Sequence, residues 1–482
     1  MQLTNSLTRR KEPLIPIRPG EVSLYTCGPT VHDFAHVGNF RTFIFEDLLR
    51  RALIFKGFRV RHVMNITDVD DKTIRKANAE GVPLGEFTAR YKRAFFEDLD
   101  ALRIQRAEHY PEATDHIAGM VALIERLLER GHAYRSAEGS IYFRLESWPG
   151  YGQLVALDRG SSRQTARVDQ DEYGKDDPQD FALWKAWEPS DGPVFWDTAL
   201  GRGRPGWHIE CSAMSRALLG DHFDIHTGGV DNKFPHHENE IAQSVCATGA
   251  AFVNVWMHSA HLQVEGFKMS KSLGNFLTLR DLVQEGLDPV AIRYALLTVH
   301  YRKPLNFTRE WVAASAQAVG RLRDFARRLD EALEGVDGGG GGEPGGELGG
   351  ALEVARGGFV AGLEDDLNIA ASLSALFTFV RQANAILDGG GAGRAEIEAA
   401  RGWLGEVDGV LDVLEGREGP GEGIVEEVEA LVGAREAARA ARDWSRADAL
   451  RAQIEGMGFE VRDGAQGPRW IKVRGSGSGP DR

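Results

Sequence analysis

The fold is decided between Glu21 and Asn65, where the chain reads EVSLYTCGPTVHDFAHVGNFRTFIFEDLLRRALIFKGFRVRHVMN. Residues 21–28 form a largely apolar run that stops at a Gly-Pro pair, which predicts a strand. Apolar residues recur at helical spacing from 40 to 56, and 58–65 reads as a second strand. A right-handed βαβ crossover places the connecting loop at the carboxyl edge of a parallel sheet, where ligands bind.

That loop has the composition of an anion site. It holds His32, His36, Gly38 and Asn39 and opens onto the helix N-terminus. Free backbone N–H groups and the helix dipole favour a phosphate there. One loop histidine is more often an exposed polar side chain, so the phosphate prediction depends on two histidines and a glycine together.

Four residues far apart in the sequence form a candidate metal-binding set. They are Cys27, Cys211, His236 and Glu240. Pro235 suits the first turn of a helix, so His236 and Glu240 would project from one helical face. Two thiolates, an imidazole and a carboxylate suit zinc. A buried cysteine is more often a small apolar side chain, which is the prediction for Cys246.

Two further loops carry nucleotide-binding chemistry. Thr227-Gly-Gly-Val-Asp231 follows a strand-like run and ends in a carboxylate that could approach a ribose, although such a turn is as often an ordinary one. Lys268-Met-Ser-Lys-Ser272 places two lysines among small hydroxyl residues after Gly266. Such a loop can swing a cation onto a polyphosphate and release it, and this string is the most specific local signal in the chain.

Composition predicts a soluble, cytoplasmic protein of several domains. The chain has 482 residues, three cysteines and a net charge of −14. Three cysteines give no disulfide framework, and the chain shows neither a signal peptide nor an uncharged apolar run that would span a bilayer. The acidic balance argues against general nucleic-acid affinity, but residues 435–482 hold 10 Lys/Arg against 7 Asp/Glu, so that end is net +3.

The remaining elements are expected in a fixed order. An insertion after Ala107 should contain a helix and a hairpin, and Gly338 to Gly350 should be a mobile loop. The predicted helices and hairpin strands are 116–130, 133–135 with 140–144, 351–387, 395–414, 424–455, and 458–463 with 468–473.

Taken together, the motifs resemble the cysteinyl-tRNA synthetase family of class I aminoacyl-tRNA synthetases, from about Leu7 to Trp470. The matching pieces are Tyr25–Val31, His36–Asn39, Asn65–Asp68, Gly206–Met214, Gly228–Glu240, Trp256–His258 and Lys268–Ser272. The resemblance implies an α/β fold with a Rossmann-like parallel-sheet catalytic domain, an inserted α+β connective domain, an α-helical bundle and a small anticodon-binding module. The expected boundaries are 1–106 with 204–250 for the catalytic domain and 107–203 for the inserted connective domain. Residues 251–307 would form the region that carries the lysine loop, Lys268–Ser272. The helical bundle would span 308–423, with a flexible loop at 335–350, and the anticodon-binding module 424–482.

The implied activity is that of a cysteine–tRNA ligase (EC 6.1.1.16). ATP activates L-cysteine to the adenylate, and the cysteinyl group passes to the 3′ end of tRNA(Cys). The resemblance implies one Zn²⁺ per subunit on Cys27, Cys211, His236 and Glu240, with the substrate sulfur as a further ligand, and Mg²⁺ arriving with ATP. Zinc favours thiolate over the harder hydroxyl of serine, which would make editing unnecessary. A monomer with no membrane partner is expected.

Residue roles are carried over by the same resemblance. The catalytic residues would be His36, Asn39, Lys268 and Lys271; ATP would contact His36, Gly38, Asn39, Gly228, Gly229, Asp231 and Lys271; cysteine would contact Thr67 and Trp207; and Trp470 would stack on an anticodon base. Asn39 stands where the class signature has a second histidine, so it can donate a hydrogen bond to a phosphate but cannot become a cation. His32 stands where a tyrosine is frequent, which leaves its role open.

Three other functions fit parts of the pattern. A cysteine ligase acting on an amino sugar would keep the active site and lack the anticodon-binding end. A non-catalytic tRNA-binding relative would be expected to lose loop lysines or zinc ligands. An unrelated nucleotidyltransferase with a structural zinc site would not be driven to pyrophosphate exchange by cysteine alone.

Overall fold

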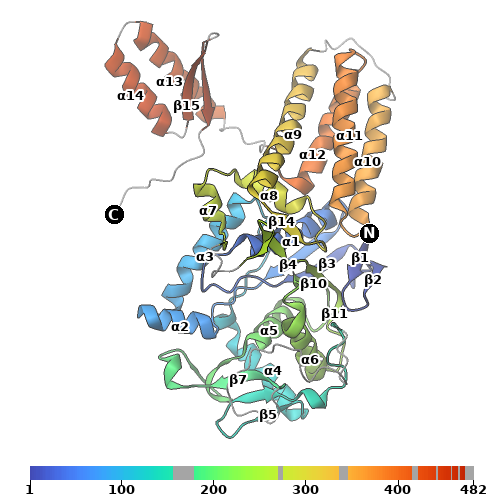
Figure 1. Cartoon of the computed structure of the whole chain (residues 1–482), viewed down its shortest axis with the longest axis vertical. Helices are drawn as coiled ribbons and strands as arrows, with labels where there is room; N and C mark the ends of the chain where they lie inside the picture. The colour runs from blue at the N-terminus through green and yellow to red at the C-terminus, as the bar shows by residue number, and fades with distance from the viewer. Residues whose placement is uncertain are drawn as a thin grey trace. The chain divides into compact units, whose positions relative to one another are not determined.

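The structure is a computed structural model and is shown in Figure 1. It describes residues 1–155, 179–269, 275–335, 346–414, 422–440, 443–456, 459–464 and 467–472. The chain divides into two compact units, Met1–Val413 and Leu414–Arg482, which are described separately.

A four-stranded parallel sheet lies at the centre of the first unit. Its strands are β3 (Glu21–Thr26), β4 (Arg59–Met64), β10 (Phe223–Gly229) and β11 (Val253–Ser259), in the order β11-β10-β3-β4. Every neighbouring pair is parallel. The predicted βαβ unit is therefore confirmed, with α1 (Val37–Phe55) between β3 and β4, and α6 (Glu238–Thr248) connects β10 to β11 in the same way.

Helix α1 is buried along almost its whole length. It begins at Val37, three residues earlier than predicted, because His36 caps it, and 14 of its 19 residues are buried. A helix that is buried all round belongs to the core of a large protein. Its buried residues include Arg41, Asp47 and Arg51, and buried charges need partners.

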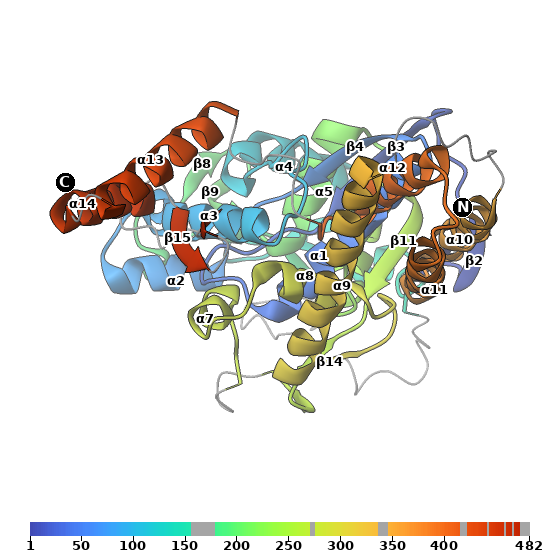
Figure 2. The same ribbon diagram turned by 90° about the horizontal axis from the view of Figure 1, so that it is seen from above.

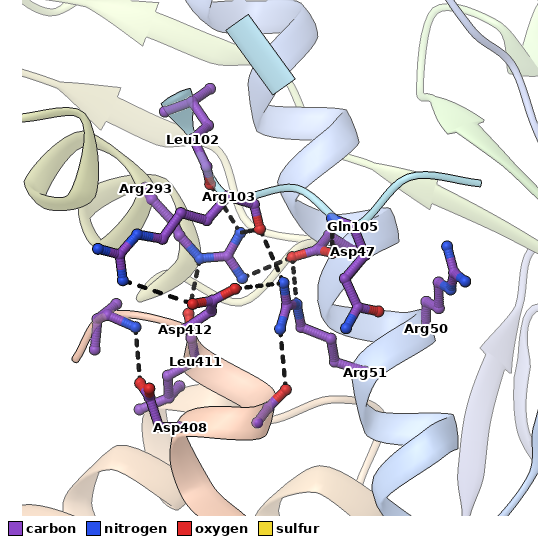
Figure 3. A network of polar contacts seen from close by, with 12 residues as sticks. Asp47, Arg50, Arg51, Leu102, Arg103, Gln105, Arg293, Asp408, Leu411 and Asp412 are labelled. Carbon is purple, nitrogen blue, oxygen red and sulfur yellow. Dashed lines mark hydrogen bonds and ion pairs between the residues drawn. The ribbon is translucent and has the colours of Figure 1, made fainter. Parts of the chain in front are cut away.

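Figure 3 shows how the charges of Asp47 and Arg51 are satisfied. The Asp47 carboxylate lies between the guanidinium groups of Arg51 and Arg293, at 2.8 Å and 2.6 Å. Arg293 comes from α8 (Pro289–Leu297), is fully buried, and donates to the carbonyl of Leu411 at 2.7 Å. Arg51 donates to the Asp412 carboxylate at 2.7 Å. Two cations therefore meet the C-terminal end of a bundle helix, where its free carbonyls and dipole favour positive charge.

The inserted region carries its own antiparallel sheet. The order is β5-β6-β7-β9-β8, built from β5 (Ala133–Arg135), β6 (Ile141–Phe143), β7 (Phe181–Ala186), β8 (Trp196–Thr198) and β9 (Gly201–Pro205). With α4 (Ile117–Glu129) this is the predicted α+β insertion. Residues 156–178 of this insertion lie outside the described residues.

Shorter elements surround the central sheet. Helices α2 (Asp71–Glu80) and α3 (Leu84–Ala101) follow β4, and α5 (Trp207–Leu219) precedes β10. The others are β1 (Gln2–Asn5), β2 (Arg10–Pro13), β12 (Leu262–Val264), β13 (Phe267–Lys268), α7 (Leu279–Gln284) and β14 (Leu305–Phe307).

Helices α9 to α12 run side by side as a bundle (Figures 1 and 2). They are α9 (Arg309–Gly335), α10 (Glu347–Glu364), α11 (Ile369–Asp388) and α12 (Arg394–Leu411). The single helix predicted at 351–387 is wrong: it is broken where Asp366 and Leu367 take φ of 58° and 55°. The Asp366 carboxylate accepts from Thr4 and from the Tyr301 hydroxyl, so tertiary contacts hold this break.

The start of α10 also differs from the prediction. The sequence predicted a mobile loop as far as Gly350, yet Gly349 and Gly350 lie in the first turn of α10, where the Glu396 carboxylate accepts from the Gly349 N–H at 2.8 Å. A side chain from another helix therefore satisfies a free N–H at this helix end. Residues 336–345 lie outside the described part of the chain.

Helix α11 is the one helix among the described residues whose length and apolarity would suffice to cross a membrane. It nevertheless carries Arg381 and Asp388, and its buried residues pack inside the bundle, including Leu376 and Phe379. This packing is that of a core helix.

The second unit contains a helical pair and a hairpin. Helices α13 (Glu422–Ala440) and α14 (Trp444–Gly456) pack together, and β15 (Phe459–Gly464) pairs with β16 (Gly467–Lys472) in antiparallel register. The terminal hairpin is confirmed, and the helix predicted at 424–455 is two helices instead.

Candidate active site

The four predicted metal ligands meet at the carboxyl edge of the parallel sheet. Cys27 follows β3, Cys211 lies in α5, His236 lies in the turn before α6, and Glu240 lies in the first turn of α6. All four side chains are buried, and one donor atom from each lies within 4.8 Å of the others. Two sulfurs, a nitrogen and a carboxylate oxygen at this spacing suit a zinc ion.

A second donor set overlaps the first and was missed by the sequence reasoning. It combines His226 and His237 with Cys27 and Glu240, again within 4.8 Å and fully buried. The Cys27 sulfur lies 3.2 Å from His237 Nε2. The sequence gives only part of the signal for this second set. His226 ends a strand-like run and His237 follows His236, but no local pattern connects either histidine to Cys27.

Hydrogen bonding favours the first set as the ligands. His236 Nε2 lies 3.2 Å from Glu240 Oε1. His208 Nδ1 lies 2.8 Å from His236 Nδ1, and His226 Nε2 lies 3.0 Å from Glu240 Oε2. Among the described residues no hydrogen bond reaches Oε1. An outer partner therefore orients His236 and another orients Glu240, and each of these two ligands keeps one atom for a metal, as is usual in metal sites.

Burial shifts the pKa values of this cluster toward the uncharged forms. It raises the pKa of the Cys27 thiol well above its ordinary value and also raises the pKa of the Glu240 carboxyl. Burial also lowers the pKa of His236 and His237, so both imidazoles are neutral. Neutral imidazoles can ligate a metal at once, and a divalent cation would displace the proton of the thiol.

The turn that carries His236 differs from the prediction. Pro235 does not open α6: Lys233–His237 forms a π-type turn in which Phe234 is extended, with φ −143° and ψ 133°, and α6 begins at Glu238. His237 Nδ1 then lies 2.8 Å from His258 Nε2. The π-type turn thus directs two successive histidines to different partners.

A cavity of about 670 Å³ opens beside the metal set. Its lining includes Cys27, His36, Asn39, Trp207 and Asp231. Trp207 is half exposed and stacks on His236, with ring centroids 4.5 Å apart and planes at 26°. The predicted cysteine-binding tryptophan thus lies between the cavity and the metal set.

The turn predicted to bind phosphate, His36–Asn39, is called the phosphate-site turn, and two reciprocal hydrogen bonds cap it. His36 Nδ1 accepts from the Asn39 N–H at 3.1 Å, and Asn39 Oδ1 accepts from the His36 N–H at 3.1 Å. The Asn39 oxygen is thereby used, and its NH₂ group is the donor left for a ligand. Gly38 is required because a Cβ would meet the His36 ring and Met269 at 3.0 Å.

Two other predicted residues, Thr67 and Gly228, lie away from the cavity lining. Thr67 is buried and its hydroxyl accepts from Asn65 Nδ2 at 3.1 Å. Gly228 lies within β10, where a Cβ would meet the His237 ring at 2.9 Å, so it admits that histidine. Gly229 and Asp231 do line the cavity.

The lysine loop is described only at its ends. Lys271 lies outside the described residues, and Lys268 is described only as the last residue of β13. On the far side of the loop, the Phe276 ring stands edge-on to His36 with centroids 5.0 Å apart, and the Leu277 carbonyl accepts from the Val37 N–H at 3.0 Å. The segment that follows the loop therefore packs against the phosphate-site turn.

Three family profiles match the chain in order. The tRNA synthetases class I (C) catalytic domain matches residues 13–317, the DALR domain matches 358–415, and the cysteinyl-tRNA ligase anticodon binding domain matches 422–470. The first match alone covers more than half of the chain.

Full-length relatives agree with these profiles. The chain is 46% identical over 480 residues to the cysteine–tRNA ligase of Chlamydia muridarum, covering 98% of this chain and 99% of that one. It is 48% identical over 466 residues to the cysteine–tRNA ligase of Chlamydia pneumoniae, covering 96% and 97%. In fold it resembles Mycobacterium tuberculosis methionyl-tRNA synthetase, with a TM-score of 0.59 at 18% identity, covering 82% and 90%. The chain belongs to the cysteine–tRNA ligase family of class I aminoacyl-tRNA synthetases.

Proposed function

We propose that the cavity beside Trp207 binds L-cysteine and ATP, and that Cys27, Cys211, His236 and Glu240 hold the zinc ion that selects the amino acid. One observation carries this proposal: four buried donor atoms within 4.8 Å of one another adjoin a cavity that also contains the phosphate-site turn. When bound, the zinc ion supplies a thiolate-selective ligand position for the substrate sulfur. Trp207 then forms the wall that holds the bound amino acid against the metal set.

The protein's part in the first step is positioning and charge stabilisation. A cysteine carboxylate oxygen attacks the α-phosphorus of ATP while the bond to the β-phosphate breaks and pyrophosphate leaves. His36 and the NH₂ group of Asn39, at the N-terminus of α1, would hold the triphosphate, and Gly38 lies between them in the same turn. Gly229 and Asp231, which line the same cavity, would contact the ribose. Mg²⁺ would accompany the phosphates.

The second step transfers the cysteinyl group to RNA. A terminal ribose hydroxyl of tRNA(Cys) attacks the adenylate carbonyl, AMP leaves, and no protein nucleophile is needed. The cysteinyl-tRNA ligase anticodon binding match at 422–470 supports tRNA over an amino sugar as the acceptor. The intact metal set and the two loop lysines support a catalytic protein over a binding-only relative.

Metal analysis combined with cysteine-dependent ATP–pyrophosphate exchange tests the proposal. About one zinc ion per chain is expected, together with exchange driven by cysteine and not by serine. A protein without zinc, or one that activates serine as readily, would overturn it. A control reaction with the isolated adenylate and tRNA(Cys) separates the transfer step from activation.

Replacing Lys271 with alanine should slow adenylate formation by about 10²- to 10³-fold, the usual cost of removing one group that stabilises transition-state charge. The KM for cysteine should change little, because the metal set remains intact. Stopped-flow or rapid-quench measurement of adenylate formation checks this. Loss of cysteine affinity would instead remove Lys271 from the phosphate role.

Replacing Trp470 with alanine should reduce the efficiency of charging tRNA(Cys) and leave pyrophosphate exchange intact. Stacking on a base is worth roughly 1–3 kcal/mol. Trp470 lies on β16 opposite Val461. Unchanged kcat/KM for tRNA(Cys) in steady-state aminoacylation would rule out the anticodon role.

The finer organisation is also proposed. We retain the boundaries 1–106 with 204–250, 107–203, 251–307, 308–423 and 424–482 as functional domains. We also propose a monomeric, cytoplasmic protein, and the three free cysteines support the cytoplasmic part of that proposal. Thr67 and Lys268 keep the roles of a cysteine-pocket residue and a phosphate-binding residue as hypotheses.

A further inference from the structure

A buried tyrosine of the central sheet has a hydroxyl that the roles above do not use. Tyr25 lies in β3, two residues before Cys27, and is fully buried. Its hydroxyl has no hydrogen-bond partner among the described residues, although most buried tyrosine hydroxyls have one. A buried donor without a partner needs an explanation, and an ion bound nearby is one of the usual ones.

Packing fixes the position of this ring. It meets the His226 ring edge-on, with centroids 5.0 Å apart and planes at 64°, and its centroid lies 6.2 Å from that of Phe223. Strand β3 is an inner strand, paired with β10 on one side and β4 on the other, and α5 packs against it (Figure 1). A ring held in this way keeps its hydroxyl inside the protein.

Three of the four proposed zinc ligands lie near the phenol. Burial raises the pKa of Tyr25, and the negative charges that Cys211, Cys27 and Glu240 carry when ionised raise that pKa further. A contact with the Cys211 side chain acts in the same direction, although its geometry falls short of a hydrogen bond. Cys211 is therefore the ligand best placed to accept from the hydroxyl.

The outer partners of the other ligands point to the same residue. Each of those three ligands has a histidine beside it: the pairs are His236 with His208, Glu240 with His226, and Cys27 with His237. Cys211 is the one ligand of the set with no such partner among the described residues. Metal ligands usually have an outer partner, so the Tyr25 hydroxyl and the Cys211 sulfur each lack what the other supplies.

The phenol faces the metal set from the protein core. Cys27 and Trp207 line the cavity, whereas Tyr25 is not part of that lining. Tyr25 belongs instead to the apolar cluster that contains Cys27 and Cys211. The hydroxyl therefore does not reach an amino acid in the cavity, and it can act on one only through a metal ligand.

We propose that the Tyr25 hydroxyl donates a hydrogen bond to the zinc-bound thiolate of Cys211, which makes Tyr25 a positioning residue for the amino-acid site. The inference rests on the proposed function, because it requires a zinc ion on Cys211. A charged sulfur accepts a hydrogen bond more strongly than a neutral thiol. Such a bond also withdraws negative charge from Cys211, which leaves more of the zinc charge to attract the substrate sulfur.

Metal affinity and a cobalt spectrum test this proposal without an activity measurement. In Tyr25→Phe, which keeps the ring, zinc affinity measured by competition with a chelator should fall about 10- to 100-fold, the usual cost of losing an outer partner. In the Co²⁺-substituted protein, the thiolate-to-cobalt charge-transfer band should move to longer wavelength. The reason is that a thiolate gives up its electrons more readily once a hydrogen bond to it is lost.

Tyr301→Phe is the matched control. Tyr301 is also buried, and its hydroxyl donates to the Asp366 carboxylate at 2.7 Å, between α10 and α11. Removing that hydroxyl takes a donor from a buried carboxylate, so the variant should unfold at a lower temperature than wild type. Its zinc affinity and its cobalt band should equal those of the wild-type protein.

The outcomes separate this inference from the function on which it rests. An unchanged zinc affinity in Tyr25→Phe, or equal effects in Tyr25→Phe and Tyr301→Phe, would overturn the proposal. A weaker affinity with an unmoved charge-transfer band would also overturn it, because the ring would then support the site by packing alone. A wild-type protein that binds no zinc would instead overturn the proposed function itself.

Discussion

Replacing Cys211 with serine should strip the metal from the protein and remove cysteine-dependent pyrophosphate exchange. A hydroxyl is a harder and less ionised ligand than a thiol, so it does not replace Cys211 in a site with a second thiol and an imidazole. The loss should exceed the roughly 10–100-fold that removal of an outer partner of a metal ligand typically costs. Zinc content and the KM values for cysteine and for ATP check this, with the ATP value little changed because His36 and Asn39 remain in place.

Cys246→Ser is the matched control for that substitution. Cys246 lies in α6, is also buried, and belongs to the same apolar cluster, and burial raises its pKa to about 12. It is in neither donor set, so its variant should retain zinc and exchange activity. If both variants lost activity equally, a general folding defect would explain the result.

A third variant decides between the two donor sets. His226→Gln should retain zinc with weakened affinity if His226 only orients the Glu240 carboxylate, to which it lies at 3.0 Å. If His226 and His237 were the ligands instead, His226→Gln would empty the site and Cys211→Ser would leave it filled. Metal content of the two purified variants therefore separates the assignments without an activity measurement.

Replacing Asp47 with asparagine should lower the free energy of unfolding of the first unit by about 3–5 kcal/mol, the usual cost of breaking a buried ion pair from one side. The substitution leaves the buried guanidinium groups of Arg293 and Arg51 without their shared counterion. Urea or thermal unfolding monitored by circular dichroism checks this. Asp197→Asn breaks an exposed pair with Arg202, and its midpoint should stay at the wild-type value.

The stability difference should also depend on pH. Burial by itself raises the pKa of Asp47, but the charges of Arg293 and Arg51 outweigh it and hold the pKa below its usual value. The carboxylate therefore contributes fully above the unfolded pKa of about 3.9, and that contribution is lost as pH falls below it toward the native pKa. The gap between wild type and Asp47→Asn should narrow only in strong acid. A gap that instead widened on acidification would contradict the assignment.

Local sequence patterns predicted the structure correctly where the signal and its physical cause lie within a few residues of each other. The strands around Cys27 and the helix after His36 follow from hydrophobic periodicity, a Gly-Pro stop and a capping pair, all of which act over short distances. The prediction was wrong at Asp366, where a bound carboxylate breaks a helix that the periodicity would continue. It was also wrong at Pro235, which does not begin a helix. The chain forms a π-type turn there, and this turn brings His236 to His208 and His237 to His258.

The sequence by itself determined which features the protein has: a parallel α/β catalytic fold, a helix N-terminus suited to phosphate, and four side chains able to hold zinc. What only the tertiary structure decided is which atoms face each other. Cys27 and Glu240 are 213 positions apart in the sequence. They belong to two possible donor sets, one completed by Cys211 and His236 and the other by His226 and His237. That choice depends on hydrogen bonds from His208 and His226, which exist only once β10, α5 and α6 have packed. Contacts of that kind are set by distances of a few ångströms between distant segments, and no local periodicity encodes them.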